Sequence, residues 1–235
     1  MTHELSRLVG DINISTSAAA AIMIKLHDRK AAMKRGESVR RRPKWFNFHH
    51  KETLEGFTLA DQGPIVVATD AATQNGRVGY AFVTTAGRFG LGAFPHPERI
   101  VGPAQTLVAE LRTVNVAIES DGNHPFIILC DSQDAVEYLR AWRRGNLIYP
   151  DGYTLYRKNG RTPTLVKLSR KLASNPRRYK VEWVKGHAGH PLNEVADSMA
   201  KLALRTLNGY FSWEEAIGLA RRYAHRTLSE VARAK

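Results

Sequence analysis

The stretch that decides the fold is VKGHAGHPLNEVAD, which runs from Val184 to Asp197. It predicts the end of a strand, a loop rich in glycine and histidine, and a helix with Pro191 in its first turn. The stretch brings the His187 imidazole and the Asp197 carboxylate into one neighbourhood. Further acids lie upstream where a fold could aim them at the same point: Asp70, Glu110 and Asp131. Four carboxylates on separate elements indicate a metal site more than a salt-bridged surface.

The elements around this stretch alternate in the manner of an α/β domain. The apolar run Pro64 to Asp70 predicts a strand buried on both faces, and Gln74-Asn75-Gly76 predicts a turn. We expect strands over 64–70, 78–84, 87–93, 125–130 and 179–185, and helices over 105–119, 131–143, 165–173, 191–207 and 212–232. A further helix is expected over 18–33, and a connector over 49–62. The expected organisation is a basic N-terminal extension (1–61), a catalytic domain (62–207) and a helical C-terminal extension (208–235).

Positive charge is concentrated in two segments of the 235-residue chain. Residues 25–51 carry a net charge of +8 and residues 140–185 one of +11, within a total of +13. The rest of the chain therefore carries −6. Two basic segments around an acidic body are typical of a polyanion binder, most simply of a nucleic-acid binder. A merely solubilising basic surface is the alternative.

Targeting signals and disulfides are not predicted. The longest strictly apolar run, residues 18–24, is too short to span a bilayer, and the first residues lack the layout of a secretory signal. A single cysteine, Cys130, excludes an internal disulfide and fits a reducing compartment. We therefore expect a cytoplasmic protein that does not insert into membranes, and a monomer.

Asp70 and Asp131 each end an expected strand. If those two strands pair in parallel, their carboxyl ends lie side by side and the two carboxylates come within a few ångströms of each other. Such a pair repels strongly in a low dielectric, unless a cation lies between the carboxylates or one of them is protonated. Glu110 and Asp197, each on a helix, can complete a ring of four acids.

Oxygen ligands without cysteine favour hard cations, Mg²⁺ or Mn²⁺ rather than Zn²⁺. Four carboxylates can hold two such ions about 3.5–4 Å apart, one to activate water and one to stabilise a leaving oxygen. That is the chemistry of in-line attack on a phosphodiester. It agrees with the charge pattern, because basic segments would bind the backbone that the acidic centre cuts.

Each candidate residue also has a purely structural interpretation. Asp131, before Ser132, could only cap a helix, and Asp197 could belong to a polar helix face. His187 could relay a proton or contact phosphate, or could make only a structural hydrogen bond in its loop. The segment Arg40 to Phe48 interleaves cations with aromatics, which suits either nucleic-acid contact or packing on the main domain. His190 is expected to cap its helix, and His49-His50 to lie at the surface.

On these residues the chain resembles a ribonuclease H of type 1. The matching pieces are Thr69-Asp70, Ala109-Glu110-Leu111, Cys130-Asp131-Ser132-Gln133, and Trp183 to Pro191 followed by Asn193, Glu194 and Asp197. The resemblance covers about residues 62–207. It implies a five-stranded mixed sheet with helices on both faces. It also implies Mg²⁺-dependent cutting of the RNA strand of RNA–DNA hybrids, leaving 3′-hydroxyl and 5′-phosphate ends.

The resemblance also implies a role for each matched residue. The metal ligands would be Asp70, Glu110, Asp131 and Asp197, and His187 would be the histidine of a mobile loop linked to catalysis or product release. The basic stretch from about Arg143 to Arg161 takes the place of the family's basic protrusion. Substrate contacts are then expected from Gln133, Asn193, Arg143, Arg144 and Lys185.

Two stretches depart from the family's usual pattern. Residues 71–76 read AATQNG after the first aspartate, where Gly and Ser are usual, and residues 105–108 read QTLV, where paired Asn often read the minor groove of the hybrid. Because telling RNA from DNA depends on contacts to the 2′-hydroxyl, other functions stay open. These are a nuclease of the same fold with another specificity (a resolvase, a transposase-like enzyme or a double-stranded RNA nuclease) and a non-catalytic nucleic-acid-binding protein.

Overall fold

The structure, a computed structural model, describes residues 47–57, 63–94, 103–119, 124–157 and 160–233. The chain divides into two compact units after Pro43, and all described residues belong to the second, Lys44–Lys235. The helix expected over 18–33 and most of the basic, aromatic segment up to Phe48 lie outside the described residues. None of the described helices is long and apolar enough to cross a membrane.

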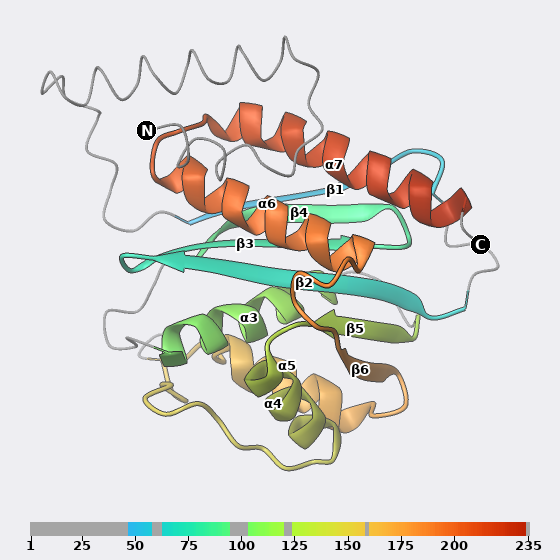
Figure 1. Ribbon diagram of the computed structural model, residues 1–235. Coiled ribbons are helices and arrows are strands. Elements are labelled where there is room, and N and C mark those ends of the chain that lie inside the picture. The colour runs from blue at the N-terminus through green and yellow to red at the C-terminus, as the bar shows by residue number, and fades with distance from the viewer. Residues whose placement is uncertain (1–46, 58–62, 95–102, 120–123, 158–159, 234–235) are drawn as a thin grey trace, which may run out of the picture. The chain divides into compact units, whose positions relative to one another are not determined.

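A mixed six-stranded sheet forms the centre of the unit, in the order β1-β4-β3-β2-β5-β6 (Figure 1). β2, β5 and β6 are parallel to one another, and the remaining pairs are antiparallel. The strands are β1 (Phe48–Thr53), β2 (Ile65–Gln74), β3 (Arg77–Thr84), β4 (Arg88–Phe94), β5 (Phe126–Cys130) and β6 (Tyr179–Trp183).

The sixth strand, β1, corrects the expected five-stranded sheet and the expected connector over 49–62. Its sequence, FHHKET, has no apolar alternation, but it pairs with β4 along its whole length, from Phe48↔Ala93 to Thr53↔Arg88. Its stability comes from this pairing at a sheet edge and from long-range contacts, which local sequence does not show.

β2 is longer than expected, so Asp70 lies inside the strand and not at its end. Strand pairing with β3 continues from Val67 to Gln74, where Asn75 and Gly76 turn the chain with φ of +49° and +73°. An Asn-Gly pair at positive φ is the favoured two-residue hairpin turn. The pairing of β2 with β5, by contrast, ends at Ala68↔Leu129. Asp70 and Asp131 therefore each lie two residues beyond the last β2–β5 pair.

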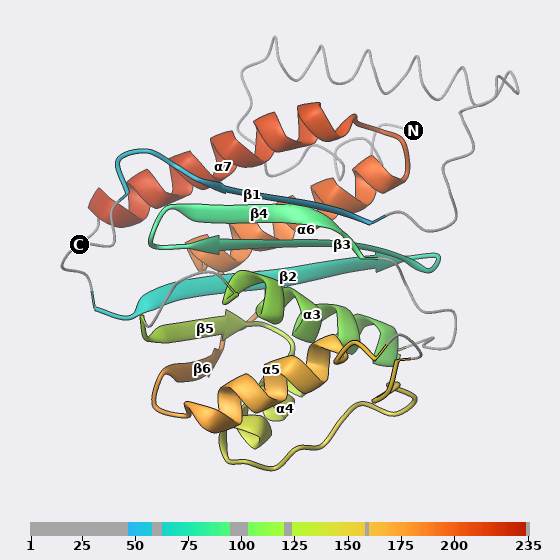
Figure 2. The same cartoon turned by 180° about the vertical axis from the view of Figure 1, so that it is seen from behind.

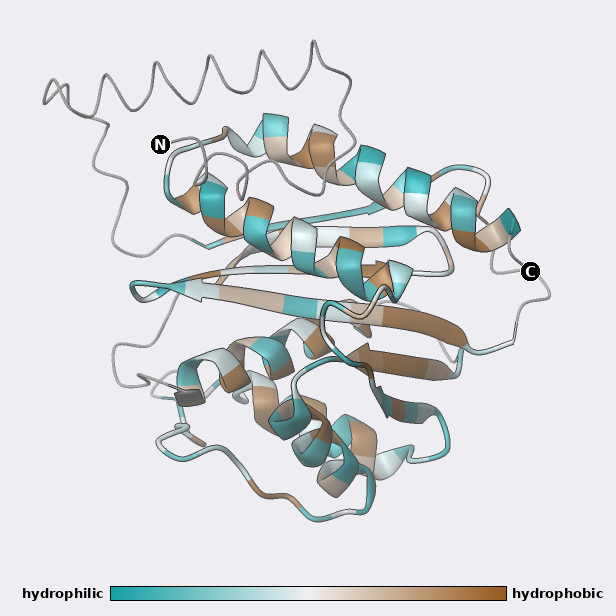
Figure 3. Ribbon diagram, in the orientation of Figure 1, coloured by the Kyte–Doolittle hydropathy of each residue, from teal (hydrophilic) through white to brown (hydrophobic). Residues whose placement is uncertain are grey.

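Helices cover both faces of the sheet, as expected (Figures 1 and 2). One face carries α3 (Pro103–Ala117), α4 (Gln133–Arg143) and α5 (Thr164–Ser174), and the other carries α6 (Pro191–Leu207) and α7 (Trp213–Arg233). Each face has its own buried apolar cluster, with Trp142 and Phe126 in the first and Met199 and Leu91 in the second. β5 and the first half of β2, which lie between these layers, are the most apolar strands in Figure 3.

α7 packs into the same core although the sequence places it beyond the expected catalytic domain. Its capping box is present, because the Ser212 hydroxyl accepts the Glu215 N–H at 3.1 Å and Glu215 accepts the Ser212 N–H at 2.8 Å. The face towards α6 buries Ala216, Ala220, Ala224 and Leu228. The Arg221 guanidinium also donates to both carboxylate oxygens of Glu52 on β1, at 2.6 and 2.8 Å.

Candidate metal centre

Three buried or half-buried acids meet where the β2–β5 pairing ends. Asp70 comes from β2, Glu110 from α3 and Asp131 from the residue after β5, and each offers a carboxylate oxygen within 4.8 Å of the other two. Glu110 points inward because α3 lies against β2, and its Oε1 accepts the backbone N–H of Ala71 at 3.1 Å. The parallel pairing that would bring Asp70 and Asp131 together is therefore confirmed.

Burial and mutual repulsion make this site hard to ionise. Burial, helped by the charges of Asp197 and Asp131, raises the pKa of the Asp70 carboxyl to about 7. Burial, and then the charges of Asp70 and Asp131, raise the pKa of the Glu110 carboxyl well above its usual range. A cation among them would offset both causes, because its charge stabilises the ionised carboxylates.

The donor set fits a hard divalent cation. All three groups offer carboxylate oxygen, and Glu110 keeps its Oε2 buried with no hydrogen-bond partner among the described residues. A buried carboxylate oxygen without a donor is costly unless a cation satisfies it. Mg²⁺ and Mn²⁺ prefer such oxygen ligands.

Asp197, the fourth expected acid, belongs to a neighbouring group on α6 and the loop before it. Its carboxylate, the Glu194 carboxylate and a His187 ring nitrogen lie within 4.8 Å of one another. The Lys201 ammonium donates to Asp197 at 2.7 Å. Asp197 is nevertheless close enough to the buried acids for its charge to raise the pKa of Asp70.

His187 is held in an exposed loop in an unusual backbone conformation. Its φ is +53°, in the left-handed region that few residues other than glycine adopt, and its side chain is 70% exposed. Its Nδ1 lies 3.9 Å from Oε2 of Glu194, whose Oε1 accepts the Gly189 N–H at 3.3 Å. His190 takes the N-cap position of α6, as expected, but its side chain makes no capping hydrogen bond.

The expected substrate contacts are spread over three places. Gln133 is exposed at the start of α4, beside Asp131, and Lys185 is exposed in the loop that carries His187. Arg143 and Arg144 follow at the other end of α4, about 15 Å along the helix from Gln133. The Arg143 guanidinium donates there to the Pro176 carbonyl, at 3.0 and 3.2 Å.

Asn193, unlike the residues at these three places, is buried. Its side chain is only 2% exposed, and its amide donates to Oδ2 of Asp131 at 3.2 Å. The sequence analysis also missed Lys201, although an acid and a lysine four residues apart on a helix predict an ion pair. It included Trp183 in the resemblance but gave it no role, and the Trp183 indole N–H donates to the Asp131 carbonyl at 3.0 Å.

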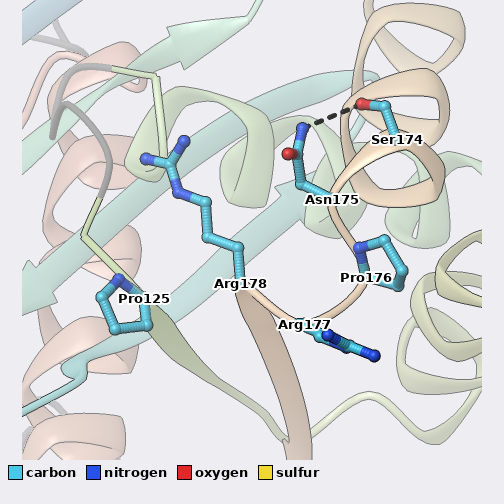
Figure 4. A pocket seen from close by; sticks show the side chains of 6 residues that line it. All are labelled: Pro125, Ser174, Asn175, Pro176, Arg177 and Arg178. Carbon is cyan, nitrogen blue, oxygen red and sulfur yellow. Dashed lines mark hydrogen bonds between the residues drawn. The ribbon is translucent and has the colours of Figure 1, made fainter.

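A basic hollow lies at the opposite ends of β5 and β6 from the acids. It is lined by Pro125, Ser174, Asn175, Pro176, Arg177 and Arg178 (Figure 4). The Arg178 guanidinium donates to the His124 carbonyl at 2.9 Å, and the Asn175 amide donates to the Ser174 hydroxyl. The hollow precedes both strands, whereas the acids follow them, so it is separate from the metal centre.

Comparison with known proteins identifies the family. The RNase H family model matches residues 62–205, which include all four acids and His187, and the chain therefore belongs to the RNase H family. The chain has the RNase H-like fold, with a six-stranded mixed sheet and helices on both faces.

The individual relatives match over shorter stretches. Ribonuclease H of Tropheryma whipplei (strain Twist) is 32% identical over 102 residues, which are 41% of this chain and 60% of that protein. Ribonuclease HI of Caulobacter vibrioides is 69% identical over 26 residues, 11% of this chain and 17% of that protein. The chain thus matches about 60% of the length of the first of these relatives.

One solved structure also aligns with the chain. It is the N-terminal RNase H domain of rv2228c from Mycobacterium tuberculosis, with a TM-score of 0.41, 23% identity, and coverage of 62% of this chain and 96% of that one. The family assignment is independent of this alignment, because it follows from the family model.

Proposed function

We propose that this protein is a metal-dependent endonuclease that hydrolyses the RNA strand of RNA–DNA hybrids. The observation that carries the proposal is the cluster of Asp70, Glu110 and Asp131, together with the buried Glu110 oxygen that has no partner among the described residues. Family membership supports the hydrolysis of a phosphodiester at these carboxylates.

The proposed ligands are Asp70, Glu110, Asp131 and Asp197, and the proposed ions are two Mg²⁺ or Mn²⁺. Bound there, such ions would make water a stronger nucleophile near neutral pH and neutralise charge on the scissile phosphate. Asp70 must lose its proton before it can bind a cation, because its pKa is raised to about 7. Asp197 must share its carboxylate with a cation or give up the Lys201 ammonium.

His187 is proposed to exchange a proton or contact phosphate at the edge of this centre. Its exposed ring lies beside Glu194, and an imidazole can hold or release a proton near neutral pH. Gly186 and Gly189 flank this part of the loop.

Positive charge outside the centre is proposed to bind the phosphate backbone. The segments 25–51 and 140–185 carry most of this charge, and cations that neutralise phosphates supply salt-dependent affinity. Among described residues, Gln133 and Lys185 are exposed next to the acids and are the nearer candidates for contact. Arg143 and Arg144 would reach a duplex only along the length of α4.

A second candidate, a nuclease of other specificity, is favoured by one observation. The two stretches that depart from the family's pattern meet in space, because the Thr73 and Thr106 hydroxyls hydrogen-bond at 3.0 Å. Hydroxyls that bond to each other are less free to recognise a 2′-hydroxyl than paired asparagines would be.

A substrate panel separates the two candidates. One labelled sequence is offered as RNA–DNA hybrid, double-stranded RNA, double-stranded DNA and single strands, with Mg²⁺ and with chelator. Chelator-sensitive cutting of the hybrid's RNA strand alone supports the first candidate. Cutting of double-stranded RNA or of DNA supports the second, and binding without any cutting supports a non-catalytic role.

A further inference from the structure

Asp131 is held by contacts from two neighbouring parts of the fold, the last residue of β6 and the first turn of α6. The Trp183 indole donates to the Asp131 carbonyl, and the Val184 N–H donates to the Cys130 carbonyl at 3.1 Å. These two hydrogen bonds fix the backbone of Asp131 at the end of the β5–β6 pairing.

Two groups lie close to one oxygen of the Asp131 side chain. The Asn193 amide donates to Oδ2 at 3.2 Å. The backbone of Gly186 also lies near this oxygen, because a Cβ added there would be 3.1 Å from Oδ2 and 3.7 Å from Cγ. With a larger residue at position 186, the carboxylate or the loop would have to shift by a few tenths of an ångström.

Asn193 is too deeply buried to reach a duplex on the surface. Its side chain is 2% exposed, and its Oδ1 has no partner among the described residues. The bond to Asp131 is the one polar side-chain contact that the described part of the chain gives it. A buried amide whose one polar contact is a carboxylate can act on the site by positioning that carboxylate.

We propose that Asn193 and Gly186 form a clamp on Oδ2 of Asp131, which leaves Oδ1 free as the oxygen for a cation, so that Asn193 is a positioning residue and not a substrate contact. The inference rests on the proposed function. Partners that orient a metal ligand reduce the freedom it loses on binding, and their removal weakens metal binding or activity. The loop that carries His187 therefore passes close to a metal ligand, because Gly186 directly precedes His187.

The direct test measures metal binding without substrate. Asn193→Leu keeps the branched shape and the number of side-chain heavy atoms but removes the donor, and Gly186→Ala adds the Cβ that would press on Oδ2. Thr206→Val is the matched control, because it removes a buried hydrogen bond elsewhere on α6, from the Thr206 hydroxyl to the Leu202 carbonyl. Calorimetry with Mg²⁺ gives Kd for each variant, and thermal unfolding in chelator shows that each is folded.

We expect a Kd for Mg²⁺ about tenfold higher or more in Asn193→Leu, a smaller increase in Gly186→Ala, and no change in Thr206→Val. In an Asp131→Asn background, Asn193→Leu should change Kd no further, because the clamp then has nothing to position. An unchanged Kd in Asn193→Leu together with a raised KM for hybrid would overturn the proposal and restore a substrate contact.

A second readout separates this proposal from the proposed function. The side-chain amide of Asn193 should give slowly exchanging ¹⁵N signals that shift in Asp131→Asn. If wild-type protein binds no Mg²⁺, the proposed function fails, and these signals alone decide about the clamp. Asn193 amide signals that are the same in wild type and in Asp131→Asn would contradict the clamp.

Discussion

The backbone N–H of Ala71 donates to Oε1 of Glu110 at 3.1 Å and joins β2 to α3 one residue beyond Asp70. This bond holds the Glu110 carboxylate inside the protein, next to two other acids, where its second oxygen has no partner among the described residues. An arrangement that costs folding energy in this way is typical of a site built for a ligand. Its consequences can be measured.

Asp70→Asn should abolish Mg²⁺-dependent cleavage and leave hybrid binding intact or tighter, because it removes a ligand and a charge that repels phosphate. It should also stabilise the protein in chelator at pH 8. The Asp70 pKa of about 7 lies well above the unfolded value, so the ionised carboxylate opposes folding by on the order of 2–4 kcal/mol. Urea unfolding and a binding assay check this. Retained turnover, or a less stable variant, would be evidence against the site.

Stability and metal affinity should depend on pH in opposite directions. A carboxyl whose folded pKa is raised keeps its proton in the folded state, so its contribution to stability falls as pH rises from about 4 to about 7. A cation must displace that proton, so Mg²⁺ affinity should rise through about pH 7. Calorimetry at pH 6 and pH 8 measures the second effect. Equal Mg²⁺ affinity at pH 6 and pH 8 would contradict the raised pKa of Asp70.

Leu228→Ala should destabilise the protein by about 2–5 kcal/mol, because the Leu228 side chain is 2% exposed in the cluster between α7 and α6. Glu230→Ala is the control on the same helix. It removes only the exposed ion pair with Arg226 and should cost under about 0.5 kcal/mol. Urea unfolding distinguishes them. Equal, small effects would mean that α7 is a detachable extension.

Deletion of residues 1–43 should weaken hybrid binding and flatten its salt dependence. Each phosphate contact contributes about 0.9 to the slope of log K against log salt, and residues 25–43, which this deletion removes, carry a net charge of +6. The cut must precede β1, because Phe48–Thr53 belongs to the sheet. Binding measured at several salt concentrations tests this, and an unchanged slope would show that the segment does not contact nucleic acid.

The sequence predicted the strands and helices whose positions are set by local apolar patterns. Apolar runs located β2 and β5, helical spacing located α3, and the stretch from Val184 to Asp197 located the last strand and helix of the family match. β1 was wrongly expected as a connector, because its sequence has no apolar alternation and its partners on β4 lie from 35 residues (Thr53↔Arg88) to 45 residues (Phe48↔Ala93) along the chain. Strand pairing of this kind is a property of tertiary structure.

The sequence predicted which residues form the site better than it predicted the contacts among them. The two strand patterns brought Asp70 and Asp131 together only on the condition of parallel pairing, which the structure confirms. Asp70 nevertheless lies inside its strand, since the hairpin with β3 continues after the pairing with β5 ends. The burial of Asn193 depends on how α6 packs over Asp131, which no local pattern encodes. Its expected substrate contact was therefore an interpretation from resemblance alone.

We propose that Asp70, Glu110, Asp131 and Asp197 together carry out hydrolysis of the RNA strand of a hybrid. The most direct measurement incubates an end-labelled RNA–DNA hybrid with Mg²⁺ and wild type, Asp70→Asn, Glu110→Gln, Asp131→Asn or Asp197→Asn, and maps the product ends. We predict internal cuts in the RNA strand with 3′-hydroxyl and 5′-phosphate ends for wild type, loss of cutting in chelator, and at least a 100-fold loss, by order of magnitude, in every variant. Undiminished cutting by the variants, cutting in chelator, or ends of another kind would contradict the account.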